Sequence, residues 1–366
     1  MRKKPTKAGK TMPRAARDHA VLGIDTSNYK TSVALVSQEG DIICNLQRFL
    51  DVKKGERGLR QSVALFQHVN RLPEMIEQAF AALPPATILD GVAVSSRPRP
   101  VEGSYMPVFL AGLSAARTIA AARSLPLMTF SHQEGHVAAV RFRSPLEDTE
   151  RFLSFHFSGG TSECLLADGD SLNIVGGSKD LAFGQVLDRV GVAMGFGFPC
   201  GQEIDRLAME EAARREDLKE IGSSAAGRVK GSLLPKIKCE DGYINLSGIE
   251  TKCQRLLQET AREKTPEKTL EKAGEAPAET GVLSFGQLSA MLMDRICQAM
   301  ADQTAQLAEK YDVSDALFAG GVSSSQYIRR FLPERLAGIR CCFGEPSLSC
   351  DNAVGIALLG GRELWR

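Results

Sequence analysis

Apolar and polar residues follow one another along the chain in blocks that predict a mixed α/β fold. Short apolar runs at Val21–Ser27 and Leu89–Val94 end in small polar residues, as buried strands do where they enter a turn. Val63–Leu83 instead repeats its apolar residues at helical spacing, and Val108–Ser124 is an alanine-rich segment that also favours a helix. The apolar stripe expected to face the core of the first helix is Val69, Leu72, Ile76, Phe80 and Leu83.

A pair of strands joined by a turn of small residues occurs twice. Val21–Ser37 forms the first copy and Phe152–Ala167 the second, roughly 130 residues later, which is the length of one domain. A third apolar run, Ala316–Ser323, also ends in a Gly-rich turn. Small residues let backbone amides approach phosphate oxygens. The order of these turns predicts an α/β protein with the two-lobed actin/Hsp70/sugar-kinase-like fold and a duplicated ribonuclease-H-like core.

Two of the five histidines stand four residues apart in His132-Gln133-Glu134-Gly135-His136. Side chains at i and i+4 of a helix lie on the same face. Ser131 and Glu134 have the spacing of a capping box, which predicts that a helix begins directly after Ser131. The pair is therefore either part of a divalent-metal site, which needs a further ligand from elsewhere, or two surface histidines at a polar helix start.

Composition and charge limit the classes of function. The 366 residues carry a formal net charge of +1, so no overall basic field indicates nucleic-acid binding. The nine cysteines contain no Cys-x-x-Cys pair, which favours reduced thiols and a cytoplasmic location over a disulfide scaffold or a structural zinc site. No run of 18 apolar residues occurs, so we expect no membrane span and no membrane partner.

We expect three parts along the chain. Residues 1–20 carry seven Lys or Arg and one acid, which predicts a basic disordered extension or, alternatively, a tRNA-binding arm. Residues 21–150 are expected to form the N-terminal lobe, with the first phosphate turn and the histidine helix. Residues 151–366 are expected to form the C-terminal lobe, with the second phosphate turn and a nucleoside pocket. A flexible insertion near residues 262–281 is expected in this lobe, because it is rich in Lys, Glu, Pro and Ala.

Several motifs, in an unchanged order, are similar to those of a known family. Gly23–Ser27 resembles Gly-Ile-Glu-Thr-Ser, His132–His136 resembles His-Met-Glu-Gly-His, and Gly320–Ser323 matches Gly-Gly-Val-Ser. Further matching motifs are Ser158–Gly160, Gly184–Arg189, Phe198–Gly201 and Cys350–Asn352. With these motifs, about residues 20 to 365 resemble the tRNA N6-adenosine threonylcarbamoyltransferases, formerly called O-sialoglycoprotein endopeptidases.

The resemblance implies an acyltransferase that moves a threonylcarbamoyl group from threonylcarbamoyl-adenylate to adenosine 37 of tRNA. His132, His136 and Asp351 would hold one divalent ion, iron or zinc. The turn Ser158-Gly159-Gly160-Thr161-Ser162 would cradle the phosphate of the adenylate or of an adenine nucleotide, and Asp188 would bind the ribose hydroxyls. The residues expected to line the nucleoside pocket are Gly201, Asp205 and Ser325. Besides tRNA, the implied partners are the homologous or small ATPase proteins of the tRNA-modification complex.

The chain departs from the family pattern on the side expected to face the acceptor. Asn28-Tyr29-Lys30 stands where the family has Cys-Asp-Glu, and Arg97-Pro98-Arg99 stands where it has Gly-Pro-Gly. Thr161 replaces a histidine, and Cys200 replaces a glycine. A phenol, which titrates near pH 10, cannot replace a carboxylate as a base near neutral pH.

These residues leave three interpretations of the function open. The chain is a transferase with altered acceptor contacts at Tyr29, Lys30, Arg97 and Arg99, where arginines offer fork-shaped donors to an anion. Alternatively, it is a catalytically impaired paralogue that binds nucleotide and metal as a partner subunit. The third interpretation is a related carbamoyltransferase or kinase that acts on another acceptor.

Overall fold

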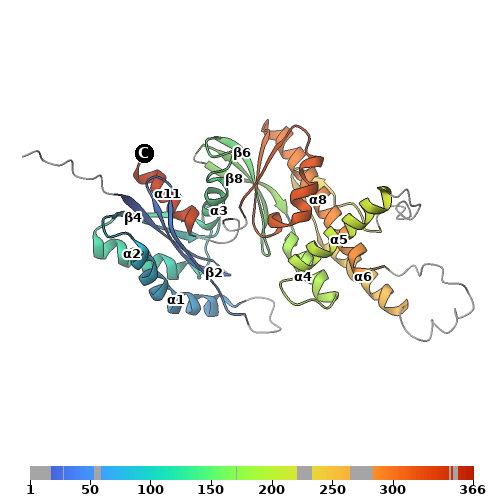
Figure 1. Ribbon diagram of the computed structural model, residues 1–366, viewed down its shortest axis with the longest axis horizontal. Coiled ribbons are helices and arrows are strands. Elements are labelled where there is room, and N and C mark those ends of the chain that lie inside the picture. The colour runs from blue at the N-terminus through green and yellow to red at the C-terminus, as the bar shows by residue number, and fades with distance from the viewer. Residues whose placement is uncertain are drawn as a thin grey trace, which may run out of the picture.

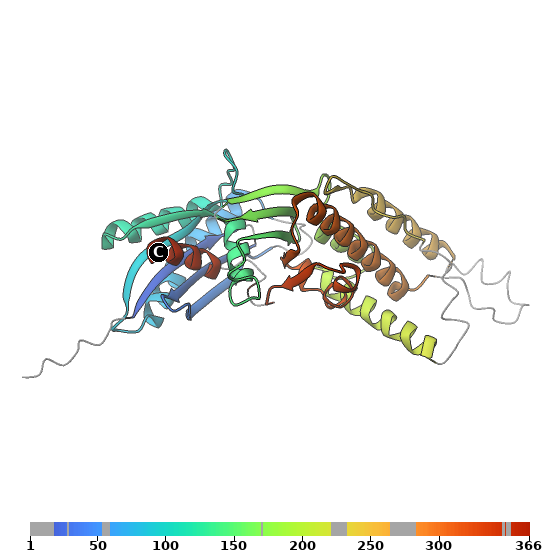
Figure 2. The same cartoon turned by 90° about the horizontal axis from the view of Figure 1, so that it is seen from above.

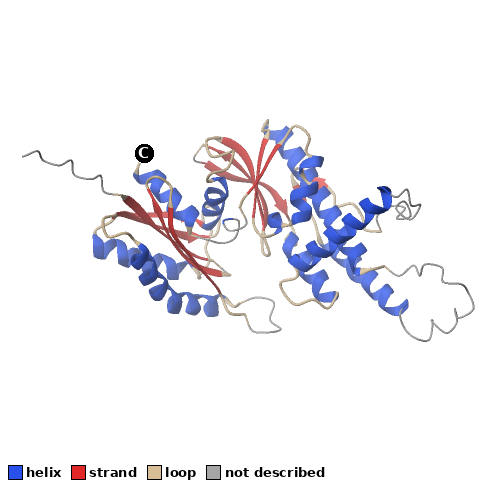
Figure 3. Ribbon diagram, in the orientation of Figure 1, coloured by secondary structure: helices blue, strands red, loops and turns tan. Residues whose placement is uncertain are grey.

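The computed structural model describes residues 18–27, 29–52, 59–169, 171–220, 233–263, 283–345, 348 and 353–366. Within these ranges the chain forms two sheets with helices packed on both (Figures 1 and 3). The first sheet has the strand order β3-β2-β1-β4-β5. Its strands are β1 (His19–Thr26), β2 (Lys30–Ser37), β3 (Ile42–Phe49), β4 (Ile88–Arg97) and β5 (Leu127–Ser131).

The second sheet has seven described strands in the order β12-β11-β6-β7-β8-β10-β9. The strands are β6 (Arg151–Phe157), β7 (Ser162–Asp168), β8 (Ser171–Ser178), β9 (Cys239–Glu240), β10 (Tyr243–Ile244), β11 (Asp315–Ala319) and β12 (Arg340–Phe343). Its strands β6 and β7 are buried along most of their length, although each carries polar side chains, among them His156 of β6 and Glu163 of β7.

The two sheets repeat one topology. In each, three strands form an antiparallel meander, β1-β2-β3 or β6-β7-β8. In each, the first strand of that meander then pairs in parallel with a later strand, β4 or β11, which is followed in parallel by β5 or β12. The predicted duplicated core is therefore confirmed, and the two strand–turn–strand motifs of the sequence are its first hairpins.

Helices cover both faces of the first sheet. α1 (Gln61–Ala82) and α2 (Phe109–Arg123) pack on one face, where Leu72, Met75 and Ala116 join the core. α11 (Val354–Leu364) packs on the other face against β1, β2 and β4. The C-terminal helix thus belongs to the first lobe by its contacts, although the expected boundary assigned residues 151–366 to the second.

The apolar stripe expected for α1 is wrong in part. Val69 is 54% exposed, whereas the buried residues of the helix are Ala64, His68, Leu72, Met75 and Ala79. The buried face of α1 is therefore turned away from the expected stripe. It includes a histidine and small residues, which a stripe of large apolar side chains leaves out.

The second sheet carries the larger core. α4 (Phe183–Ala193), α5 (Gly201–Glu220), α6 (Ser247–Glu263) and α8 (Phe285–Tyr311) contribute to one continuous cluster of buried side chains. The short helix α9 (Gln326–Phe331) follows the turn after β11, and the 3-10 turns Val322–Ser324 and Pro333–Arg335 flank it. Phe155 and Phe318 stack at the centre of the cluster, with ring centroids 4.9 Å apart.

Helix α3 (His132–Arg141) lies between the two sheets (Figures 1 and 2). One of its faces contacts α11, and Val137 and Val140 pack against Phe152, Leu165 and Leu317 of the second sheet. The histidine motif therefore lies where the two lobes meet. None of the described helices has the length and apolar character needed to cross a bilayer. Residues 1–17 and 264–282, which hold most of the predicted extension and insertion, lie outside the described ranges.

Candidate functional site

The start of α3 is fixed by the capping box expected from the sequence. Ser131 Oγ accepts a hydrogen bond from the Glu134 amide at 3.1 Å, and the Ser131 amide donates to the Glu134 carboxylate at 2.6 Å. Both residues thus satisfy amides that the first helical turn leaves without partners. The cap fixes where the helix begins, and with it the face that carries His132 and His136.

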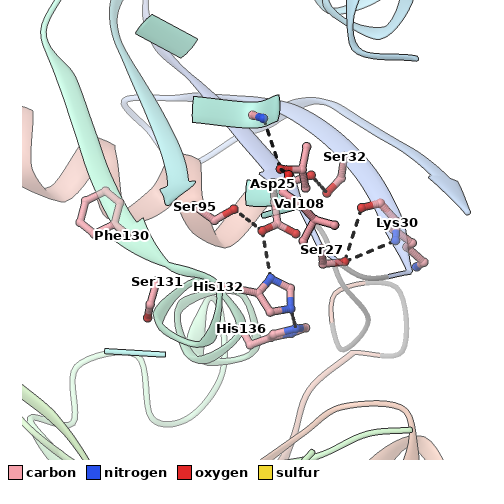
Figure 4. A network of polar contacts seen from close by, with 12 residues as sticks. Asp25, Ser27, Lys30, Ser32, Ser95, Val108, Phe130, Ser131, His132 and His136 are labelled. Atoms are coloured by element: carbon pink, nitrogen blue, oxygen red, sulfur yellow. Dashed lines mark hydrogen bonds and ion pairs between the residues drawn. The ribbon is translucent and has the colours of Figure 1, made fainter. Parts of the chain in front are cut away.

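His132 is held from behind by a buried carboxylate at the end of β1. Its Nδ1 lies 2.9 Å from Oδ1 of Asp25, and the Ser95 hydroxyl on β4 donates to the same oxygen at 2.5 Å (Figure 4). Asp25 is 1% exposed, and its Oδ2 has no hydrogen-bond partner among the described residues. Three elements, β1, β4 and α3, therefore meet at one carboxylate.

The two histidines of the motif face each other. Nε2 of His136 lies 2.9 Å from Nε2 of His132 (Figure 4). With Nδ1–H of His132 donated to Asp25, Nε2 of the neutral ring carries the lone pair and accepts from Nε2–H of His136. His156 on β6 is a third ring in this group, since its centroid lies 4.4 Å from that of His136. Both His136 and His156 are buried.

The residues present fit a divalent ion at the His132–His136 pair. Imidazole nitrogens that converge at one point, with a carboxylate behind one of them, are a common way to hold zinc or iron. Among the described residues, no group of three or more His, Cys, Asp or Glu side chains is already arranged to surround an ion. The expected third ligand, Asp351, lies outside those residues.

The start of α11 crosses α3 within the histidine motif. A Cβ on Gly355 would overlap the carbonyl of Gly135 and lie 2.9 Å from the Ala139 amide nitrogen. Because Gly135 stands between His132 and His136, this crossing packs the start of α11 directly on the helix that carries both histidines.

The first turn is braced by a buried histidine of α1. Nε2–H of His68 donates to the Ser27 carbonyl at 2.8 Å, and Nδ1 lies 2.8 Å from the Thr31 hydroxyl, from which it accepts. Burial lowers the pKa of His68, and only the hydrogen bond to Ser27 and the charge of Asp25 oppose this effect. A neutral ring, with one donor and one acceptor, matches both contacts.

Lys30 directs its charge into the first hairpin. Its Nζ donates to the Gln47 side chain at 2.9 Å and lies 4.4 Å from the centroid of the Phe49 ring, while the residue is only 5% exposed. Tyr29 lies against the second turn, since its hydroxyl oxygen is 3.4 Å from the Cβ position of Gly160. The structure thus brings the first and second turns together.

The second turn, residues 158–162, is organised around Ser158 and the start of α4. Oγ of Ser158 accepts from the Thr161 amide at 3.1 Å, and Oγ of Ser162 accepts from the Phe183 amide at 2.9 Å. Gly184 packs so closely on Gly159 and Ser158 that a Cβ would lie 2.6 Å from each. The turn is therefore a rigid corner whose Gly159 faces open space.

Arg97 and Arg99 pair with carboxylates at the contact between the lobes. Arg97 lies 3.5 Å from the Glu134 carboxylate, and Arg99 lies 2.7 Å from that of Glu163 on β7. The Gln133 amide also donates to Glu163. The arginines predicted to face the acceptor therefore connect the loop after β4 to α3 and to the second sheet.

The residues expected at the nucleoside lie in two clusters. In the first, Asp188 accepts the Cys200 amide at 2.8 Å, next to Gly201 at the start of α5. Burial raises the pKa of Asp188, and the hydrogen bond from Cys200 partly offsets this rise. In the second cluster, Asp205 accepts the Ser325 hydroxyl at 2.5 Å and also the first amides of α9. Asp205 and Ser325 thus act together as the cap of that helix.

Sequence reasoning did not single out Asp25, His68 or His156. Asp25 lies in the motif Gly23–Ser27, where the family pattern quoted above has Glu, and this exchange was the available signal. His156 lies two residues before the second turn, inside the buried strand β6 and between Phe155 and Phe157. A polar side chain in a fully buried strand is itself a signal of a partner across the sheet.

Comparisons with known proteins match most of the chain to one family. The family model for tRNA N6-adenosine threonylcarbamoyltransferase matches residues 46–358. The tRNA N6-adenosine threonylcarbamoyltransferase of Enterococcus faecalis is 30% identical over 346 residues, which cover 92% of this chain and 88% of that protein. The one from Bacillus subtilis is 29% identical over 351 residues, which cover 94% and 90%.

Solved structures of other proteins share the fold. T. kodakarensis HypF superposes with a TM-score of 0.57 at 12% identity, covering 95% of this chain and 48% of that one. Component A of the Acidaminococcus fermentans (R)-2-hydroxyglutaryl-CoA dehydratase gives a TM-score of 0.51 at 12% identity, covering 95% and 99%. At this identity the likeness concerns the architecture alone, and it confirms the predicted fold class.

Proposed function

Because this chain belongs to the tRNA N6-adenosine threonylcarbamoyltransferase family, we propose that it transfers threonylcarbamoyl from an adenylate to adenosine 37 of tRNA. The observation that carries the proposal is the convergence of His132 and His136, Nε2 to Nε2 at 2.9 Å, where the two lobes meet. Both histidines lie within the residues that the family model matches.

We propose that His132, His136 and Asp351 hold one divalent ion, iron or zinc. When bound, such an ion supplies a Lewis acid that polarises oxygen atoms of the donor. The chain itself would position the ligands, since Asp25 holds Nδ1 of His132 and the helix cap at Ser131 fixes where α3 begins. The Nε2 atoms of the two rings lie 2.9 Å apart.

The second turn is the part of the site proposed to bind the phosphate of the adenylate. Gly159 lies beside open space, and Tyr29 faces the turn from the first lobe. The Asp188 carboxylate is partly buried and points its Oδ1 at the Cys200 amide, which leaves Oδ2 for the ribose hydroxyls. An adenine nucleotide is therefore the proposed ligand of the cleft. tRNA and the proteins of the modification complex are its proposed partners.

A catalytically impaired paralogue is the second candidate, and one observation favours it. Within the described residues of the first turn, Lys30 is engaged with Gln47 and Phe49, and Tyr29 faces the second turn. Neither side chain offers the carboxylates that the family pattern has at these positions. A chain of this kind would bind metal and nucleotide and act as a partner subunit, or would serve another acceptor.

Mass spectrometry of tRNA nucleosides tests the proposal. The purified chain, its partner proteins, threonylcarbamoyl-adenylate and unmodified tRNA are expected to yield threonylcarbamoyladenosine at position 37. His132→Ala and Asp351→Ala should abolish both the product and the bound metal. His19→Ala, which removes a histidine paired with Asp90 at the far end of β1, is the matched control and should retain both. Nucleotide binding without any product in the unaltered chain would contradict the transferase and support the partner subunit.

A further inference from the structure

Asp25 is a buried carboxylate beside the histidine pair. It lies 1% exposed at the end of β1, and both side-chain hydrogen bonds that its carboxylate accepts, from Ser95 and His132, fall on Oδ1. Its Oδ2 is buried and has no partner among the described residues. A buried, unsatisfied carboxylate oxygen is costly to a fold, so its presence calls for a compensating charge nearby.

Asp25 lies directly behind His132, one of the two rings proposed to hold a divalent ion. A carboxylate that accepts Nδ1–H fixes the imidazole tautomer, and the lone pair is then on Nε2. In this structure Nε2 of His132 points to Nε2 of His136. The arrangement is that of a ligand ring oriented by a carboxylate on its other nitrogen.

We propose that Asp25 is the positioning carboxylate of the metal centre, holding His132 in the tautomer and orientation that bind a divalent cation. This inference rests on the metal site proposed above. The ion brings two positive charges, and two neutral imidazoles bring none. The carboxylates of Asp25 and Asp351 bring one negative charge each, so the assembled centre is neutral. Among the described residues, two side chains donate to the Asp25 carboxylate, the hydroxyl of Ser95 and Nδ1–H of His132.

The contacts that support Asp25 extend to β4. The Ser95 hydroxyl, which is fully buried, donates to Asp25 Oδ1 and holds the carboxylate against β1. His132 also contacts the ring of Phe109 on α2, with centroids 5.9 Å apart. Its imidazole therefore has little freedom to turn once the hydrogen bond to Asp25 is formed.

The experiment compares Asp25→Asn and Asp25→Ala with a matched carboxylate–histidine pair. Asp90 on β4 lies 2.8 Å from Nδ1 of His19, in the same sheet but at its other end, so Asp90→Asn is the control. Zinc affinity of the full chain is measured by competition with a chromophoric chelator. The Co²⁺-substituted protein provides a visible spectrum that reports the ligand geometry, and thermal unfolding is followed without metal.

We expect Asp25→Ala to weaken zinc binding about 10- to 100-fold, which is the usual effect of removing an outer-shell partner, and to shift the Co²⁺ spectrum. Asp25→Asn keeps the shape and an acceptor oxygen but removes the charge, so its loss should be smaller. The metal-free Asn variant should unfold at the same temperature as the unaltered chain or higher, because an unpaired buried charge has been removed. Asp90→Asn should leave zinc affinity and spectrum unchanged.

Unchanged zinc affinity and an unchanged Co²⁺ spectrum in both Asp25 variants would overturn the inference while leaving the metal site intact. A metal-free Asn variant that unfolds at a much lower temperature, with unchanged affinity, would assign Asp25 a purely structural role. Failure of the metal site itself has a different result: the unaltered chain would bind no zinc, or His132→Ala would bind it as well as the unaltered chain.

Discussion

Helices α3 and α11 cross at Gly135 and Gly355, and the contacts there predict a different cost of alanine at each of these glycines. A Cβ on Gly355 meets backbone, namely the carbonyl of Gly135 and, at 2.9 Å, the amide nitrogen of Ala139. A Cβ on Gly135 meets only the end of the Ile356 side chain, 2.7 Å away. Gly248, the second residue of α6 as Gly355 is of α11, has nothing within 4 Å of its Cβ position.

The three Gly→Ala variants should therefore differ in the free energy of unfolding. Alanine in a helix gains up to about 1 kcal/mol over glycine when space is free, so Gly248→Ala should be neutral or stabilising. At Gly355 the helices must move apart, and overpacking of this kind costs about 1–3 kcal/mol, which exceeds the gain. Gly135→Ala should fall between them, because the Ile356 side chain can turn aside.

Urea unfolding of the three purified variants measures these differences, and zinc competition shows their effect on the site. Because α11 follows Asp351 and packs on the helix of His136, Gly355→Ala should also weaken zinc binding, whereas Gly248→Ala should not. A Gly355→Ala protein as stable as Gly248→Ala, with unchanged zinc affinity, would refute the argument that this crossing positions the site.

Three further predictions concern the rest of the fold. Burial by itself would raise the pKa of Asp180, but hydrogen bonds from residues 181, 246 and 247 outweigh it and lower the pKa from 3.8 to about 2. The free energy of folding that comes from the ionised carboxylate is therefore fully present above about pH 4 and is lost as the pH falls towards 2. Asp180→Asn should therefore lower the free energy of unfolding by about 1 kcal/mol at pH 7, a value already reduced for solvent exposure. Near pH 2 the variant and the unaltered chain should unfold alike in acid unfolding curves. Phe155→Ala, which removes a fully buried ring stacked on Phe318, should cost about 3–5 kcal/mol in urea unfolding. Arg99→Ala should cost no more than about 1 kcal/mol in the same assay, because the arginine is half exposed and Glu163 keeps its bond from an amide side chain.

The helix cap and the first hairpins were accessible to sequence reasoning because they depend on neighbouring residues. The capping box at Ser131 predicted the start of α3, and the two strand–turn–strand motifs predicted the paired hairpins of the duplicated core. The buried face of α1 was missed because it includes His68, whose partners, Ser27 and Thr31, are about 40 residues away in the chain.

In the candidate site, too, some features follow from neighbouring residues and others only from packing. His132 and His136 share one helix turn, so their spacing alone indicated that they lie on one face. Whether they face solvent or each other depended on α3 packing between two sheets, which no local pattern reports. Arg97 and Arg99 were expected at an acceptor, but their partners Glu134 and Glu163 come from other elements.

Residue types at short spacing carry the repeated strand–turn–strand motif, the histidine helix and the family resemblance, so these features were readable along the chain. The contact of Asp25 with His132, the place of His156 beside His136, and the return of the C-terminal helix to the first sheet depend on packing between distant segments. A buried polar group must find its partner in space. That partner is set by how strands and helices pack, and can stand anywhere along the chain.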